Sequence, residues 1–144
     1  MIYKHLLVAI DMADDCNFVL GRATALARHC QAPLSVVHVL EPLTLAFGSD
    51  VPLDISELQE AQLEETRQRL HVFIERHPEL DPVRCHLVFG QPRQAIHELA
   101  QAQGCDLIIT GSHGRHGLSL LLGSTSNDLL HGATCDVLAV HLDK

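Results

Sequence analysis

The sequence has few aromatic residues and few basic ones. Aromatic side chains make up 3 % of the 144 residues, and tryptophan is absent. Lysine and arginine number 10 against 18 aspartate and glutamate residues, which gives a formal net charge of −8. Nucleic-acid binding needs a basic face that neutralises phosphates, and single strands also need aromatic stacking platforms. The composition therefore argues against a nucleic-acid-binding protein.

Long hydrophobic runs and paired cysteines are lacking as well. The apolar runs are far shorter than the ~20 residues of a membrane-spanning helix. The strand pattern that begins near residue 4 leaves no room for a signal peptide. No CxxC pair occurs, so neither a disulfide framework nor a zinc knuckle is indicated. We expect a cytoplasmic protein without a membrane anchor, whose cysteines are Cys16, Cys30, Cys85, Cys105 and Cys135.

The common catalytic motifs are also missing. The chain has no Walker A sequence, no GxSxG and no HExxH, and no glycines follow its first predicted strand as a dinucleotide fingerprint requires. Among 11 histidines, His113 and His116 lie three residues apart, but a zinc site needs a third ligand at a convincing spacing. We expect no catalytic residues, no metal site and no enzyme activity beyond weak ATP hydrolysis.

Strand and helix patterns alternate along the whole chain. Continuous apolar runs predict strands over residues 4–11, 34–40, 84–89, 106–110 and 136–142, as in a parallel sheet covered on both faces. Helical spacing predicts helices from the capping residues 14–15 to 30, and over 54–77, 92–104 and 124–131. This alternation predicts a doubly wound α/β fold in one domain, residues 1–144. The positions expected to face inward in the first two helices are Phe18, Val19, Ala23, Leu26, Ala27, Cys30, Leu58, Leu63, Leu70, Phe73 and Ile74.

The most informative stretch runs from Gly111 to Thr125, between a predicted strand and a predicted helix. Three glycines follow the strand, and Gly123 precedes the helix together with three hydroxyl residues. Glycine lets backbone N–H groups approach an anion closely, and a helix N-terminus adds free donors. The stretch predicts a phosphate-binding loop. The alternative is a tight strand-to-helix connection that needs glycine only for its turns.

A carboxylate, Asp11, ends the first predicted strand. Ligands of doubly wound folds bind outside the carboxyl ends of the strands, where the winding reverses. If the first and fourth strands are neighbours, Asp11 and Gly111 face one crevice. An acidic group can bind ribose hydroxyls there, while the glycine loop binds phosphates. The alternative role of Asp11 is to cap a turn or the following helix.

The chain as a whole resembles the universal stress protein A family. The resemblance is carried, in order, by residues 5–11, 37–39, 90–92, 106–114 and 135–140. It implies an open five-stranded parallel sheet of order 3-2-1-4-5 with helices on both faces. It also implies homodimers and a cytoplasmic role in stress tolerance.

One branch of that family holds ATP or AMP, without strong hydrolysis, through a GxxGx(9)G(S/T) motif. Here eight residues, 115–122, separate Gly114 from Gly123, one fewer than in the motif. A second branch lacks the motif and does not retain ATP. We therefore keep three hypotheses: an adenine-nucleotide-binding regulator, with or without Mg²⁺, a stress protein that acts through protein–protein interaction, and a weak nucleotide hydrolase. For the first, the resemblance implies adenosine binding at Ala9, Asp11 and Val39, and phosphate binding at Gly111, Ser112, His113, Gly114, Arg115, Gly123, Ser124 and Thr125.

The last predicted strand, residues 136–142, is apolar but lies at an edge in the implied order. Unpaired N–H and C=O groups on such an edge recruit another chain. We expect a homodimer in which two copies of this strand pair antiparallel about a twofold axis. The alternative is an edge shielded by the chain end, residues 143–144.

Overall fold

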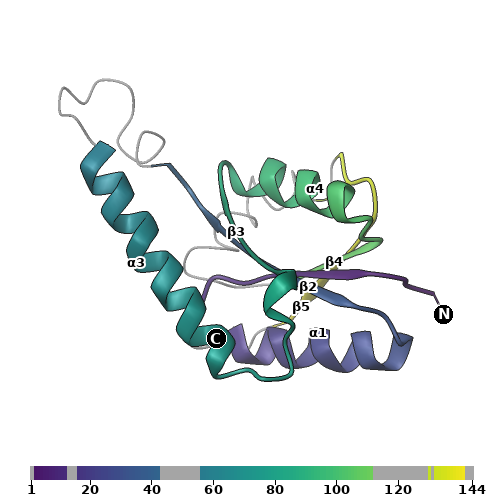
Figure 1. Cartoon of the computed structure of the whole chain (residues 1–144). Coiled ribbons are helices and arrows are strands. Elements are labelled where there is room, and N and C mark those ends of the chain that lie inside the picture. The colour runs from purple at the N-terminus through teal and green to yellow at the C-terminus, as the bar shows by residue number, and fades with distance from the viewer. Residues whose placement is uncertain (1, 13–15, 43–55, 112–129, 131, 142–144) are drawn as a thin grey trace.

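The computed structural model describes residues 2–12, 16–42, 56–111, 130 and 132–141 (Figure 1). The predicted helix 124–131 lies outside these residues except for residue 130, as do the predicted capping residues 14 and 15. No helix in these ranges is both long and apolar enough to cross a membrane. The elements are β1 (Leu6–Ala9), α1 (Cys16–Cys30), β2 (Leu34–Leu40), α3 (Ser56–Glu75), the 3-10 helix η1 (Pro82–Arg84), β3 (Cys85–Phe89), α4 (Pro92–Gln103), β4 (Leu107–Gly111) and β5 (Asp136–Val140).

The five strands form one parallel sheet of order β3-β2-β1-β4-β5. Val8 of the central strand β1 pairs with Val36 of β2 on one side and with Ile109 of β4 on the other. The chain therefore winds outward from β1 to β3 and then returns to place β4 on the free side of β1. This confirms the predicted doubly wound α/β fold and puts the reversal of winding between β1 and β4.

Helices cover both faces of this sheet, with α4 on one and α1 and α3 on the other (Figure 1). Leu6, Val8 and Ile10 pack with buried residues of α1 and with Phe73 of α3. Leu7 lies on the opposite face, where it packs with Ile96 and other buried residues of α4. Alternate strand residues point to opposite faces, so unbroken apolar strands are what a sheet between two helical layers requires.

Helices α1 and α4 end in the same way, just before a strand. After α1, Gln31 has φ 52° and its N–H donates to the Arg28 carbonyl, while the Ala32 N–H donates to the Ala27 carbonyl. After α4, Gly104 has φ 69° and the equivalent bonds run to carbonyls of its last turn. This is the Schellman pattern, in which a left-handed residue turns the chain sharply. The predicted end of the helix at Gly104 is thus confirmed.

Two predicted core positions are exposed instead. Phe18 is 48 % exposed, with the Arg22 guanidinium 5.1 Å above its ring. Residues 19, 20, 23, 27 and 30 form the buried side of α1, and Phe18 lies one residue, or about 100°, away from it. Leu58 is 60 % exposed because α3 packs on the sheet through its second half, where Leu70 is buried.

Candidate functional site

The carboxyl ends of β1 and β4 lie side by side where the winding reverses. Val8 of β1 and Ile109 of β4 are in register. Asp11 follows Val8 by three residues, and Gly111 follows Ile109 by two. Asp11 is half-buried and the Gly111 backbone is buried. The topology therefore brings together the carboxylate and the first glycine of the predicted loop, which are 100 positions apart in the chain.

Two further predicted residues line the same end of the sheet on its α4 face. Ala9 and Val39 are half-buried and pack against the cluster that contains Leu7 and Ile96. Ala9 pairs with Val37, two residues before Val39 on the neighbouring strand. An apolar wall of small side chains thus lies beside Asp11.

The segment that leaves β1 is held by hydrogen bonds from β2. The Ile10 N–H donates to the Val37 carbonyl at 2.9 Å, and Nδ1 of His38 lies 2.8 Å from the Ile10 carbonyl oxygen. A carbonyl only accepts, so His38 Nδ1 carries the hydrogen. Met12 then adopts φ 60°, which costs a residue with a side chain about 1–2 kcal/mol. The bonds thus hold the chain just before Asp11, and the left-handed residue comes just after it.

The predicted phosphate-binding loop begins at the last residue of β4. Beyond Gly111, every position predicted to contact phosphates lies outside the described residues, and the loop stays a prediction. Those positions are Ser112, His113, Gly114, Arg115, Gly123, Ser124 and Thr125.

Two thiols at the amino ends of β3 and β4, Cys85 and Cys105, are unreactive. Burial raises the pKa of Cys85 and Cys105 to about 11, with smaller contributions from neighbouring acidic groups. A thiol is a nucleophile or metal ligand only as the thiolate, so both stay inert at neutral pH. All five cysteines are free. Across the described residues, no three histidine, cysteine or carboxylate side chains converge as a metal site would require.

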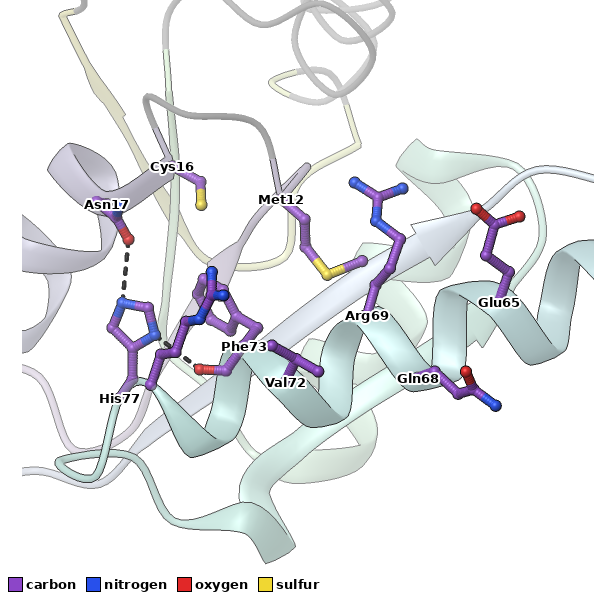
Figure 2. Close-up of a pocket in the computed structure, with 10 residues that line it drawn as sticks. Met12, Cys16, Asn17, Glu65, Gln68, Arg69, Val72, Phe73 and His77 are labelled. Atoms are coloured by element: carbon purple, nitrogen blue, oxygen red, sulfur yellow. Dashed lines mark hydrogen bonds between the residues drawn. The ribbon is translucent and has the colours of Figure 1, made fainter.

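A cavity of about 470 Å³ lies near the same edge on the α1–α3 face (Figure 2). It is lined by Met12, by the first two residues of α1, by residues of α3 from Glu65 to Phe73, and by Arg76 and His77 just after α3. His77 ties its walls together, with Nε2 3.0 Å from Asn17 Oδ1 and Nδ1 2.7 Å from the Phe73 carbonyl. Sequence reasoning missed this cavity. The sequence feature that could have indicated it is the pair Arg69 and Arg76, which lie seven residues apart in the predicted helix 54–77.

The chain is similar in sequence and in fold to known proteins. It matches the universal stress protein family over residues 2–141. It is 39 % identical to universal stress protein A homolog 1 of Coxiella burnetii over 140 residues, 97 % of each chain. The fold superposes on hypothetical protein MJ0577 with a TM-score of 0.75 at 22 % identity, covering 100 % of this chain and 99 % of the other.

A further solved structure, of a universal stress protein in complex with cAMP, superposes with a TM-score of 0.60 at 24 % identity. The superposition covers 96 % of this chain and 97 % of the chain in that structure. The family match spans nearly the whole chain, and the sheet order agrees with the one that the sequence motifs implied. This chain belongs to the universal stress protein family.

Proposed function

We propose that this universal stress protein binds an adenine nucleotide, ATP or AMP, in the crevice between Asp11 and Gly111. In our proposal it acts as a homodimeric, cytoplasmic regulator of stress tolerance without efficient catalysis. One observation carries the proposal: a carboxylate, Asp11, and the first glycine of a glycine-rich sequence, Gly111, lie at the reversal point of the sheet. This is where doubly wound folds bind nucleotides.

Each described residue has a chemical role in this proposal. The Asp11 carboxylate accepts hydrogen bonds from the ribose hydroxyls, and Ala9 and Val39 form the apolar wall against which adenine lies. Gly111 has no Cβ, so its backbone can approach the ligand closely. Loop residues 112–125 would hold the phosphates, with Mg²⁺ as a counterion. The cAMP complex of a relative supports the proposal, because cAMP shares adenine, ribose and a phosphate with ATP and AMP.

Nucleotide carried through purification gives the most direct test. Mass analysis of the protein under native and denaturing conditions should reveal an adenine nucleotide, and calorimetric titration with ATP, AMP and cAMP should give saturable heat with and without Mg²⁺. Absence of both heat and a melting shift at millimolar nucleotide would refute the proposal.

Substitution of the loop tests the phosphate end of the site. Gly114→Val should weaken ATP binding by at least tenfold if the backbone approaches the phosphates. Gly21→Ala is the matched control, because Gly21 lies on the exposed side of α1 with no atom near its missing Cβ. ATP turnover should stay well below about 1 per second. Unchanged affinity in Gly114→Val would move the phosphates elsewhere.

The alternative function is regulation by protein–protein contact without a nucleotide. The shorter spacing between Gly114 and Gly123 favours it, because one residue is missing from the segment that would surround the phosphates. The purification experiment separates the two functions. Protein that carries no nucleotide and binds none supports the alternative.

The proposed dimer forms through β5. Within the described residues β5 pairs only with β4, so its other edge presents backbone groups without strand partners. Leu138 on this strand is 41 % exposed, and Ala139 is also exposed. A second copy of β5 would pair with the edge groups and bury these apolar side chains.

Light scattering should therefore give the mass of a dimer. Ala139→Pro removes one N–H and should shift the protein toward monomer or aggregate, whereas Ala139→Ser keeps the backbone and should stay dimeric. A monomer across micromolar concentrations would refute the dimer. A folded, dimeric proline variant would place the interface elsewhere.

A further inference from the structure

We propose that the cavity between α1 and α3 is a second ligand site, which binds a small organic anion with an apolar body through Arg69 and Arg76. The site lies on the opposite face of the sheet from Ala9 and Val39. Its lining includes none of the residues proposed to bind the nucleotide.

The two arginines lie on one side of α3, seven residues apart. Arg69 is within the helix, and Arg76 continues its last turn with an N–H bond to the Val72 carbonyl. Seven residues are almost two helical turns, so the two side chains project from one face about 10 Å apart along the axis. Both line the cavity. Figure 2 shows the Arg69 side chain extending toward Met12 across the space above α3.

Neither guanidinium has an ion-pair partner among the described residues. The ion pairs of α3 there join Arg67 to Glu64 and His71 to Glu75. Glu65 precedes Arg69 by four residues, the spacing at which helical ion pairs form, yet the two are not paired. Two uncompensated guanidiniums therefore line one cavity in a protein of net charge −8.

The remaining walls describe the rest of the ligand. Met12, Val72 and Phe73 supply apolar surface, and Val72 is 42 % exposed although it is a large aliphatic residue. Asn17 and Gln68 add amide groups. Cavities of roughly 300–1,000 Å³ with apolar walls and a few polar groups are typical of small-molecule sites. The cavity volume of about 470 Å³ lies within that range.

The charges at the cavity favour an anion. Two arginines and one glutamate line it, so one positive charge is in excess at neutral pH. Both ring nitrogens of His77 make hydrogen bonds within the protein, to Asn17 and to the Phe73 carbonyl. His77 therefore connects α1 to the end of α3 and is not assigned to the ligand. Guanidinium groups match the oxygens of carboxylates and phosphates in paired hydrogen bonds. The ligand class is thus a phosphate monoester or a carboxylate with an aromatic or aliphatic body.

Calorimetry with simple probes tests the class of ligand. Phenyl phosphate and phenylacetate both carry an aromatic ring and an anionic group, and they differ in whether that group is a phosphate or a carboxylate. Benzyl alcohol has the ring without the charge, and inorganic phosphate has the charge without the ring. We expect at least one of the two aromatic anions to bind more tightly than benzyl alcohol and inorganic phosphate. No binding by either aromatic anion, or equal binding by benzyl alcohol, would overturn the proposal.

Variants test the residues. Arg69→Gln and Arg76→Gln should each weaken binding about tenfold, the loss expected for a charge-assisted hydrogen bond. Arg67→Gln on the same helix removes the same charge outside the cavity and should bind normally. Glu65→Gln should tighten binding, while Glu60→Gln, also exposed on α3, should not. Equal losses in Arg67→Gln and Arg69→Gln would show a nonspecific charge effect and overturn the assignment.

The position of the probe decides between the two sites. In ¹H–¹⁵N spectra, the aromatic anion should shift the amides of residues 16–17 and 65–77. These shifts should persist in Gly114→Val, whose substitution lies in the proposed crevice. Shifts confined to residues 9–11 and 111–125 would assign the binding to the crevice and overturn the second site. Failure of AMP to bind would refute the proposed function without affecting this test.

Discussion

The two ends of the parallel sheet are built differently. At the amino ends of the strands, side chains from distant segments bond to one another and to the backbone. At the carboxyl ends, His38 and His77 make such bonds beside the crevice and the cavity, which both lie there. The amino end thus stabilises the sheet, while the carboxyl end presents groups that a ligand can contact.

Asp106 is the centre of the amino end. Its carboxylate accepts hydrogen bonds from the Lys4 and His5 N–H groups at 2.9–3.1 Å, which joins the chain before β4 to the chain before β1. Burial alone would raise the pKa of this carboxyl, but the backbone donors outweigh burial and hold its pKa below the usual range. The ionised form is therefore the one that stabilises the fold.

His5 and Tyr3 extend these cross-links. His5 is buried, with Nε2 2.7 Å from Ser35 Oγ at the start of β2 and Nδ1 3.1 Å from the Gln103 carbonyl at the end of α4. The Tyr3 hydroxyl donates to Asp136 at the start of β5 at 2.9 Å. Four of the five strands are thus joined at this end. At the carboxyl end, His38 Nδ1 donates to the Ile10 carbonyl, and His77 joins Asn17 of α1 to the end of α3.

The largest expected effect is that of breaking the amino end. Asp106→Ala leaves two backbone N–H groups without their acceptor and should lower the free energy of unfolding by about 3 kcal/mol. Nucleotide affinity of the folded fraction should not change. Urea unfolding and calorimetry measure the two quantities. Glu79→Gln, which removes an exposed carboxylate at the same end, is the control. A weaker nucleotide affinity at full folding would contradict the division of roles between the two ends.

The converse change is made at the carboxyl end. Asp11→Asn should weaken AMP binding about tenfold, or about 1.4 kcal/mol, because a neutral amide replaces the charged acceptor of the ribose hydroxyls. The free energy of unfolding should fall by less than in Asp106→Ala. Titration calorimetry and urea unfolding give both values. A large loss of stability with unchanged affinity would make Asp11 a structural cap instead.

A smaller effect comes from the two helix ends at the amino end of the sheet. Gln31 and Gly104 close identical Schellman turns, but only the glycine adopts left-handed φ without strain. Gln31→Gly should raise the free energy of unfolding by about 1 kcal/mol. Gln31→Ala, which keeps the Cβ, should not. A thermal or urea unfolding comparison of the two variants is sufficient, and equal stabilities would show that the turn is unstrained.

The smallest effect is a pH dependence at the amino end. Burial lowers the pKa of His5 below its ordinary 6.5, although the Gln103 carbonyl opposes this. The unfolded chain then binds a proton more readily than the folded one, so stability is complete above pH 6.5 and falls on acidification below it. Asp106 adds a second loss below about pH 3.8. His5→Gln should remove the first loss in unfolding curves between pH 7 and 5, and a slope that persists would assign it to another group.

Local signals in the sequence predicted most elements well. The predicted strand 34–40 coincides with β2, and α4 begins at Pro92 and ends before Gly104 as expected. Proline suits the first turn of a helix and glycine its left-handed end, so these boundaries depend only on neighbouring residues. Phe18 and Leu58 were wrongly placed inward, because the angle at which a helix meets the sheet decides which side it buries.

The candidate crevice could be inferred in part. The strand ends at Asp11 and Gly111 and the alternation of elements were enough to place both at one edge, once β4 was assumed to lie beside β1. Asp106 had no such signal, because its acceptor role depends on backbone donors 101 and 102 positions away. The cavity could not be predicted from the sequence either, because its lining residues come from separate segments: Met12, α1, and α3 with the residues just after it.

The sequence by itself determined the order of the strands and helices, the parallel sheet between helical layers, and the family. These follow from periodicity, turn residues and motifs that act over a few positions. Only the tertiary structure decided which side chains join the strands at their amino ends, which side of each helix is buried, and that Arg69 and Arg76 line one cavity with Met12 and Asn17. Such contacts join segments dozens of residues apart, and their formation depends on how the packed layers meet.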